Sequence, residues 1–247
     1  MNDYRWVTHR NPDTALAQSA DAAAVMLPHD LLADHPGPWR EEWAKLVPYR
    51  VAYRRICHGP HVEDTTPGSS EHTEAMMIRH FGAETNEVAW TSASGRNLYQ
   101  WHLGKLDQRV VAAAYVAWMQ QGVLPYVDAV MFDYLEKSRL EWQLAMIEEF
   151  KRFAPNVDII TNGRPDGHPG DGRFVERMFR PWVHNSFADA VRESNIATAR
   201  PLVLDTFDHP ELQELAETVQ ALLSGRVFVS HGRYRESGLE VAPGVKG

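Results

Sequence analysis

The sequence contains a single cysteine and fewer basic than acidic residues. Cys57 is the single cysteine, so no intrachain disulfide can form, and its neighbours offer no partners for a structural zinc site. Lysine and arginine number 25 against 33 aspartates and glutamates, which gives a net charge of -8. Because phosphate binding needs clustered basic residues, we expect neither a nucleic acid nor an anionic membrane as a partner.

Long hydrophobic runs are also absent. The longest apolar run, 110–119, is far shorter than the roughly 20 residues that cross a bilayer. The first residues, Met-Asn-Asp-Tyr-Arg-Trp, contain no apolar segment of the kind that a secretion signal needs. We therefore expect a cytoplasmic, virion-associated or unconventionally exported protein. Since no linker or internal repeat divides the chain, we expect one domain over 1–247, with its core at about residues 20–235.

Short apolar runs that alternate with helical patterns are what the sequence does contain. The length of 247 residues and a hydrophobic content of 44% suit one α/β barrel. The expected strands are 22–27, 49–56, one arm of 87–103, 127–132, 157–161, 173–178, 201–204 and 226–230. The expected helices include 39–46, 70–80, 108–121, 138–155, 186–195 and 210–223. This order predicts a single (β/α)8 barrel with a short β-hairpin insertion near 87–103, either arm of which could be the third strand.

The segment 126–138, Tyr-Val-Asp-Ala-Val-Met-Phe-Asp-Tyr-Leu-Glu-Lys-Ser, is the most informative stretch. Its apolar half is typical of a strand buried on both faces, and it leads directly to Asp133 and Glu136. Ser138 and Glu141 then form a capping-box pattern that opens a helix. Because active sites in α/β folds lie at the carboxyl ends of strands, we expect Asp133 to be catalytic and Glu136 to contact substrate.

Other polar residues close further expected strands. Glu176 lies on the sixth strand, where it either faces the site or forms a salt bridge with a nearby arginine. The residues that end other strands, and so are expected around the same mouth, are Asn162, Asp205 and His231. Each of them could instead cap a helix or bond a loop. Parallel strands emerge on one face, which favours a shared substrate-binding role.

Aromatic and histidine residues complete the set of candidates. Trp90, Trp101 and Tyr134 are expected to stack on sugar rings beside the site, although core packing would also explain them. His29 follows the first expected strand and is a candidate for substrate binding. The His-X-His pattern of metal-dependent hydrolase barrels is missing, so we predict neither a metal nor another cofactor.

Several of these motifs resemble one family. The run 127–133, preceded by Trp90-Thr-Ser-Ala-Ser-Gly95, Trp101 and Leu106-Asp107, resembles glycoside hydrolase barrels related to endo-alpha-1,4-polygalactosaminidases. Ile160-Thr-Asn162 and Phe174-Val-Glu176 are similar to the family's asparagine-bearing fifth strand and glutamate-bearing sixth strand. The similarity covers about residues 20–235, in pattern rather than in identity, and Ala129 stands where the family usually has glycine. It implies a barrel that hydrolyses a polysaccharide.

The paired acids give a mechanistic hypothesis. Asp133 and Glu176 would flank the glycosidic bond, with Glu176 as general acid because its neighbours are apolar, and Asp133 as nucleophile or charge stabiliser. The alternative is a non-catalytic barrel that binds a polysaccharide or another protein, such as a phage structural component. Both hypotheses predict a binding site in the barrel mouth, and only the first predicts turnover.

Overall fold

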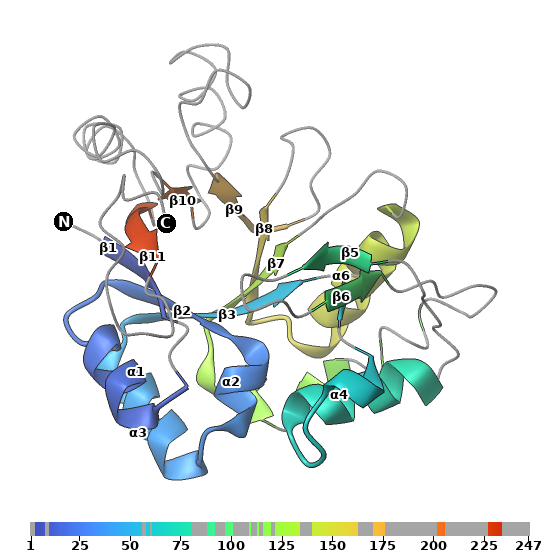
Figure 1. The fold of residues 1–247 in the computed structure, drawn as a ribbon. Coiled ribbons are helices and arrows are strands. Elements are labelled where there is room, and N and C mark those ends of the chain that lie inside the picture. Colours follow the sequence, from blue (N-terminus) through green and yellow to red (C-terminus); the bar gives the residue numbers. More distant parts are fainter. Residues whose placement is uncertain are drawn as a thin grey trace.

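The computed structural model describes residues 3–7, 10–55, 58–59, 61–80, 88–91, 97–100, 109, 113, 116–119, 122–133, 140–162, 170–175, 202–205 and 227–233. Within them, parallel strands close into a barrel in the spatial order β1, β11, β10, β9, β8, β7, β3, β2 (Figure 1). Their bounds are Asp3–Trp6 (β1), Ala24–Pro28 (β2), Tyr49–Arg55 (β3), Ala129–Asp133 (β7), Asp158–Asn162 (β8), Gly172–Val175 (β9), Leu202–Asp205 (β10) and Val227–Arg233 (β11).

The barrel strands alternate between two apolar layers. β2 and β7 read Ala-Val-Met-Leu-Pro and Ala-Val-Met-Phe-Asp, and their first four residues are buried on both faces. Side chains that point into the barrel form one cluster, which includes Tyr4, Met26, Val51, Met131 and Ile160. Side chains that point outward form a second cluster beneath the helices, which includes Val25, Leu27, Ala52, Val130 and Ile159. The two-residue period of a strand therefore determines which side chains can reach the barrel interior.

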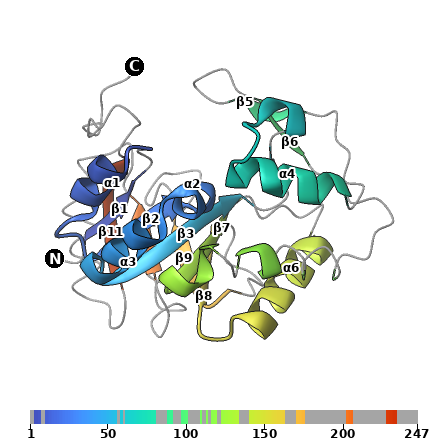
Figure 2. The same ribbon diagram turned by 90° about the horizontal axis from the view of Figure 1, so that it is seen from below.

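Helices cover the outside of these strands, as the view from below shows (Figure 2). They are α1 (Pro12–Ser19), α2 (His29–Asp34), α3 (Gly37–Leu46), α4 (Ser70–His80) and α6 (Leu140–Phe153), with 3-10 turns at Val62–Asp64 and Leu124–Tyr126. The Asn11 side chain caps α1 by accepting a hydrogen bond from the Thr14 amide at 3.0 Å. Phe150 of α6 packs edge-on against Phe132 of β7, with ring centroids 5.7 Å apart. Apolar helix faces thus bury the outward side of the sheet.

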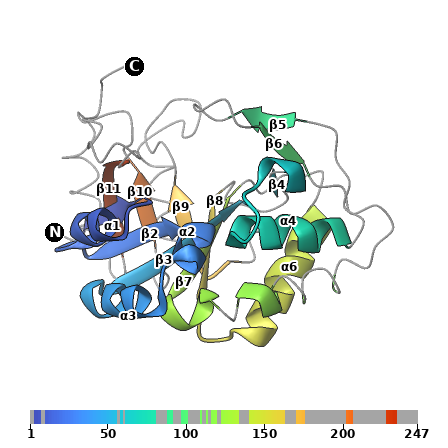
Figure 3. The same ribbon diagram turned by 60° about the horizontal axis from the view of Figure 1, so that its bottom comes forward.

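A second, antiparallel sheet lies outside the barrel. It has the order β4, β6, β5, with bounds His58–Gly59, Asn97–Gln100 and Val88–Thr91. In Figure 3 these strands lie beside α4, away from the barrel strands. β5 and β6 are the two arms that the sequence suggested for the third barrel strand, and that expectation is wrong. The residues that would connect them, 92–96, lie outside the described part of the chain.

The first barrel strand is also not the one that the sequence suggested. The run near 22–27 becomes β2, because β1 precedes it and pairs with both β2 and β11. β1 is only Asp-Tyr-Arg-Trp, too short and too polar to be recognised from its composition, and β3 becomes the third strand. The expected helices at 186–195 and 210–223 lie outside the described residues, so the complete (β/α)8 repeat remains a prediction.

Candidate active site

Among the described residues, the inward side chains at the centre of the barrel form an apolar layer that we call the floor. The inward side chains of this floor are at most 2% exposed: Tyr4, Met26, Val51, Met131 and Ile160. Tyr4 of β1 also packs on Phe228 of β11, with ring centroids 6.3 Å apart. Large side chains from strands on both sides of the barrel therefore meet in its centre, as expected for a packed barrel rather than a pore.

The next inward positions, toward the carboxyl ends of the strands, form a polar and aromatic layer that we call the mouth. It contains Trp6 of β1, Tyr53 of β3, Asp133 of β7 and Asn162 of β8. Trp6, Asp133 and Asn162 are only partly buried, and Tyr53 is 7% exposed. This layer lies at the carboxyl ends of the strands, where barrel enzymes have their active sites.

Asp133 is held from both sides. The Tyr53 hydroxyl donates to its Oδ2 at 2.7 Å, and the Asn162 amide donates from Nδ2 to its Oδ1 at 2.9 Å. Each carboxyl oxygen thus accepts a hydrogen bond. The strands explain the geometry, because β3 and β8 are the two neighbours of β7 in the sheet. Asp133 is therefore fixed in orientation at the barrel mouth.

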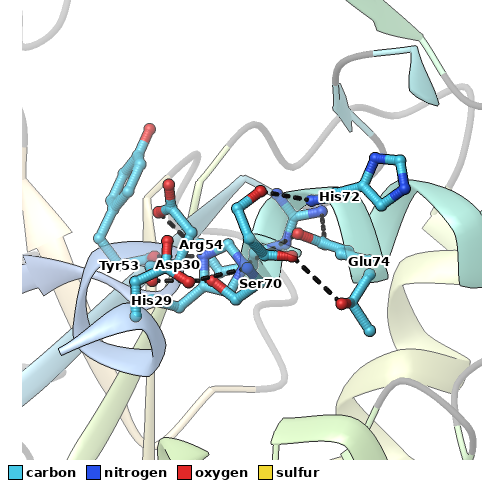
Figure 4. A network of polar contacts seen from close by, with 10 residues as sticks. His29, Asp30, Tyr53, Arg54, Ser70, His72 and Glu74 are labelled. Atoms are coloured by element: carbon cyan, nitrogen blue, oxygen red, sulfur yellow. Dashed lines mark hydrogen bonds and ion pairs between the residues drawn. The ribbon is translucent and has the colours of Figure 1, made fainter. Parts of the chain in front are cut away.

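Behind Tyr53, on the outward face of β3, lies a buried cluster that consists of the ion pair Arg54–Glu74 and of His29, and that we call the charged cluster after its ion pair (Figure 4). Arg54 forms a salt bridge with Glu74 of α4, and both side chains are less than 10% exposed. Glu74 Oε2 lies 2.9 Å from His29 Nε2, while His29 Nδ1 lies 3.3 Å from the Tyr53 carbonyl oxygen. Because buried charges must be paired, this cluster ties α4 to the strand that carries Tyr53.

The start of α4 is also attached to α2. Ser70 donates from its backbone amide to Asp34 Oδ1 at 2.7 Å and from its hydroxyl to the Asp30 carbonyl at 2.9 Å. His72, in the first turn of α4, lies 2.8 Å from the Thr65 hydroxyl. Figure 4 shows these contacts beside the charged cluster. Helix α4 is thus anchored at its first turn and again one turn later at Glu74.

The structure brings together one pair of the residues that the sequence singled out, Asp133 and Asn162. Asp205 ends β10 and pairs with Ser230 of β11, so the backbone of Asp205 and His231 also lies toward the carboxyl end of the barrel. The sequence predicts that His231 ends its strand, but β11 continues to Arg233, so His231 lies within the strand. The substrate-binding roles of Asp205 and His231 remain predictions.

His29 lies elsewhere. Its side chain is 5% exposed, contacts Glu74 and packs edge-on against Trp118, with ring centroids 5.5 Å apart. It therefore faces the helix layer, which gives its predicted role in substrate binding no support. Trp90 is part of β5 in the small sheet. The remaining candidates, Glu176, Glu136, Trp101 and Tyr134, lie outside the described residues.

Sequence reasoning missed Tyr53, Trp6 and Glu74. Tyr53 lies 80 residues from Asp133 in the chain and sits in a strand whose basic residues obscure its alternation. Trp6 belongs to the strand that was not recognised, and Glu74 is one of several acids on a helix. The Tyr-Arg pair that repeats within Tyr49–Arg55 is a sequence pattern that indicates Tyr53, because its spacing places two tyrosines on the same, inward face of the strand.

The described part of the chain holds no group of three or more histidine, cysteine, aspartate or glutamate side chains suited to a metal ion. No helix among the described residues is both long enough and apolar enough to cross a bilayer.

By sequence, no protein family and no curated protein matches the chain. Its structure is similar to a cyclic alpha-maltosyl-(1→6)-maltose hydrolase from Arthrobacter globiformis in complex with maltose, with TM-score 0.53 and 11% identity over 97% of this chain and 75% of that one. An alpha-amylase from Lactobacillus plantarum gives TM-score 0.56 and 9% identity over 94% and 71%. Eubacterium rectale Amy13B is similar with TM-score 0.51 and 11% identity, over 99% of this chain and 68% of that one.

The chain shares the fold of these hydrolases. At such low identity the similarity carries no information about substrate, and the resemblance to polygalactosaminidase-related barrels remains a prediction. The shared fold does agree with a barrel whose mouth lies at the carboxyl ends of its strands.

Proposed function

We propose that the protein is a glycoside hydrolase that cleaves a polysaccharide with two carboxylates, on a complete (β/α)8 barrel with a hairpin insertion. The observation that supports this most is the position of Asp133, in the barrel mouth with a donor on each carboxyl oxygen. Oriented carboxylates are what hydrolysis of a glycosidic bond requires. The structural neighbours named as a maltosyl-maltose hydrolase and an alpha-amylase agree with this chemistry.

In this proposal the two acids have different roles. Asp133, oriented by hydrogen bonds from Tyr53 and Asn162, acts as nucleophile or as stabiliser of positive charge at the anomeric carbon. Glu176, which directly follows the last residue of β9, protonates the leaving group. A carboxyl separation of roughly 5 Å would give retention of configuration, and about 6.5 to 9.5 Å would leave room for water and give inversion.

A substrate panel tests the proposal. Neutral α-glucans and amino-sugar polysaccharides, including α-1,4-linked polygalactosamine, would be incubated with the protein and the release of reducing ends would be measured. Cleavage of at least one polymer is expected. The Glu176→Gln variant should lose turnover on that polymer by about 10²-fold or more, yet retain turnover on an aryl glycoside whose leaving group needs no protonation. Equal losses on both substrates would remove Glu176 from the acid role.

The alternative is a barrel that binds a polysaccharide or a protein without turnover. The observation that favours it is that Tyr53 and Asn162 would equally satisfy an aspartate with a structural role. Oligosaccharide binding without cleavage of any polymer in the panel would support this alternative.

A further inference from the structure

Trp6 is an aromatic side chain of the mouth that the proposed mechanism does not use. It follows Tyr4 by two positions on β1, and both side chains therefore point into the barrel. Tyr4 is 1% exposed and belongs to the floor, whereas Trp6 is only partly buried. Because Trp6 is the last residue of β1 and lies one inward position beyond the floor, it belongs to the mouth.

The indole of Trp6 packs against Tyr53. Their ring centroids lie 4.9 Å apart, and the ring planes are tilted by 40°. The hydroxyl at the far end of Tyr53 donates to Asp133 at 2.7 Å. Aromatic surface therefore runs from Trp6 along the Tyr53 ring to the carboxylate.

This arrangement matches the two kinds of surface that a sugar ring presents. The C–H groups on one face of a pyranose are apolar and pack on aromatic rings, while its hydroxyl groups need hydrogen-bonding partners around the edge. In the mouth, Trp6 supplies the apolar surface and Asp133 and Asn162 supply carboxyl and amide groups. Both surfaces are reached from the same end of the barrel.

We propose that Trp6 is the stacking platform for one pyranose ring of the substrate, next to the bond on which Asp133 acts. This inference rests on the proposed function and specifies part of the binding site. The platform comes from β1, a strand that supplies no other residue to the mouth among the described residues.

The test measures binding separately from turnover. Maltoheptaose and an α-1,4-linked galactosamine heptamer would be titrated calorimetrically into the Asp133→Asn protein, which would leave them uncut, alone and with Trp6→Phe or Trp6→Leu added. The leucine variant should bind roughly tenfold more weakly, because a stacking contact contributes on the order of 1 kcal/mol, and the phenylalanine variant should lose less. Phe153→Leu, at an exposed position on α6, is the matched control and should bind as the parent does.

A second measurement needs no substitution at Trp6. Tryptophan side chains of the unaltered protein would be oxidised with N-bromosuccinimide, with and without oligosaccharide, and each site would be followed by peptide mapping. Bound oligosaccharide should protect Trp6 and leave the oxidation of Trp39, a helix-layer residue, unchanged. Equal oxidation of Trp6 in both samples, or equal binding by a folded Trp6→Leu variant, would overturn the platform while leaving the proposed hydrolase intact. If the unaltered protein neither binds nor cleaves any of these sugars, both the platform and the proposed hydrolase are overturned.

Discussion

Strand β3 carries the pair Tyr-Arg at both of its ends, and the two copies lie in different surroundings. At the amino end, Tyr49 donates to Asp158 at 3.0 Å. Arg50 binds Asp128 through Nε at 2.8 Å and Nη2 at 2.9 Å, with side chains 23% and 30% exposed. The hydrogen bond to Asp128 raises the pKa of Arg50. Arg50 thus binds the residue that precedes the neighbouring strand β7, and Tyr49 reaches across the barrel interior past β7 to β8, both at the amino end of the barrel.

At the carboxyl end the same two residue types are used differently. Tyr53 donates to Asp133 in the mouth at 2.7 Å, and Arg54 pairs with Glu74 in the helix layer. The Arg54 and Glu74 side chains are 7% and 3% exposed, so this pair is far more buried than its counterpart at the amino end. The comparison suggests that the amino end serves stability, whereas the carboxyl end uses a buried ion pair to hold the strand that orients Asp133.

The largest difference between the two ends is expected for the acidic partners of the arginines. Glu74→Gln should lower the free energy of unfolding by about 3–5 kcal/mol, because the buried Arg54 would lose the carboxylate with which it forms an ion pair. Asp128→Asn should cost only about 1 kcal/mol, because water can solvate the partly exposed Arg50. Chemical denaturation of both variants measures this difference. Equal losses would show that burial does not distinguish the two ends.

A smaller and more specific difference is expected for the two tyrosines. Tyr49→Phe and Tyr53→Phe each remove one hydroxyl donor, and each should cost about 1 kcal/mol of unfolding free energy. Under the proposed function, only Tyr53→Phe should also lower kcat, by roughly tenfold, because Asp133 loses the hydrogen bond that the Tyr53 hydroxyl donates. Denaturation together with steady-state kinetics tests this pair. A matching fall in kcat for Tyr49→Phe would contradict the division between the ends.

The smallest expected effect is a pH dependence of the free energy of unfolding that comes from His35, a residue outside β3. His35, which packs on Trp39 with ring centroids 4.0 Å apart, has a pKa lowered by burial; Asp34 opposes this shift and Arg40 adds to it. The unfolded chain therefore takes up this proton first, and the stability contributed by neutral His35 is complete above pH 6.5 and is lost as the pH falls toward the lowered value.

Unfolding free energies at about pH 7.5 and pH 5.5 test this expectation. The loss between these two conditions should be smaller in a His35→Phe variant than in the parent. An unchanged loss would assign the pH dependence to other groups. The result also provides a baseline, because an acid-induced fall in turnover could then be separated from an acid-induced fall in stability.

Much of the central barrel could be predicted from the sequence, since buried parallel strands are continuous apolar runs. β7 and β8 lie within one or two residues of their expected positions, and α4 matches its expected bounds of 70–80. β1 could not be predicted, because four residues with alternating polar and aromatic side chains carry too weak a pattern. It forms a strand because it pairs with β2 and with β11, and β11 lies at the other end of the chain.

The site was predictable only where chemistry follows a strand directly. Asp133 and Asn162 each end an apolar run, and this position predicted that they would lie around the same mouth; their hydrogen bond was not predicted. Tyr53 carries no such mark, because its contact with Asp133 depends on the register of two strands that a long insertion separates. Glu74 depends on how α4 packs against β3, which no local pattern encodes.

The most direct test of the account compares two aspartates that each accept a hydrogen bond from a tyrosine of β3. Asp133→Asn and Asp158→Asn change one atom each, at opposite ends of the barrel. Turnover would be measured on a polysaccharide that the unaltered protein cleaves, with circular dichroism as the check on folding. The account predicts that Asp133→Asn stays folded and loses turnover by about 10³-fold or more, while Asp158→Asn retains turnover to within about a factor of two. Undiminished turnover in a folded Asp133→Asn protein would contradict the central claim.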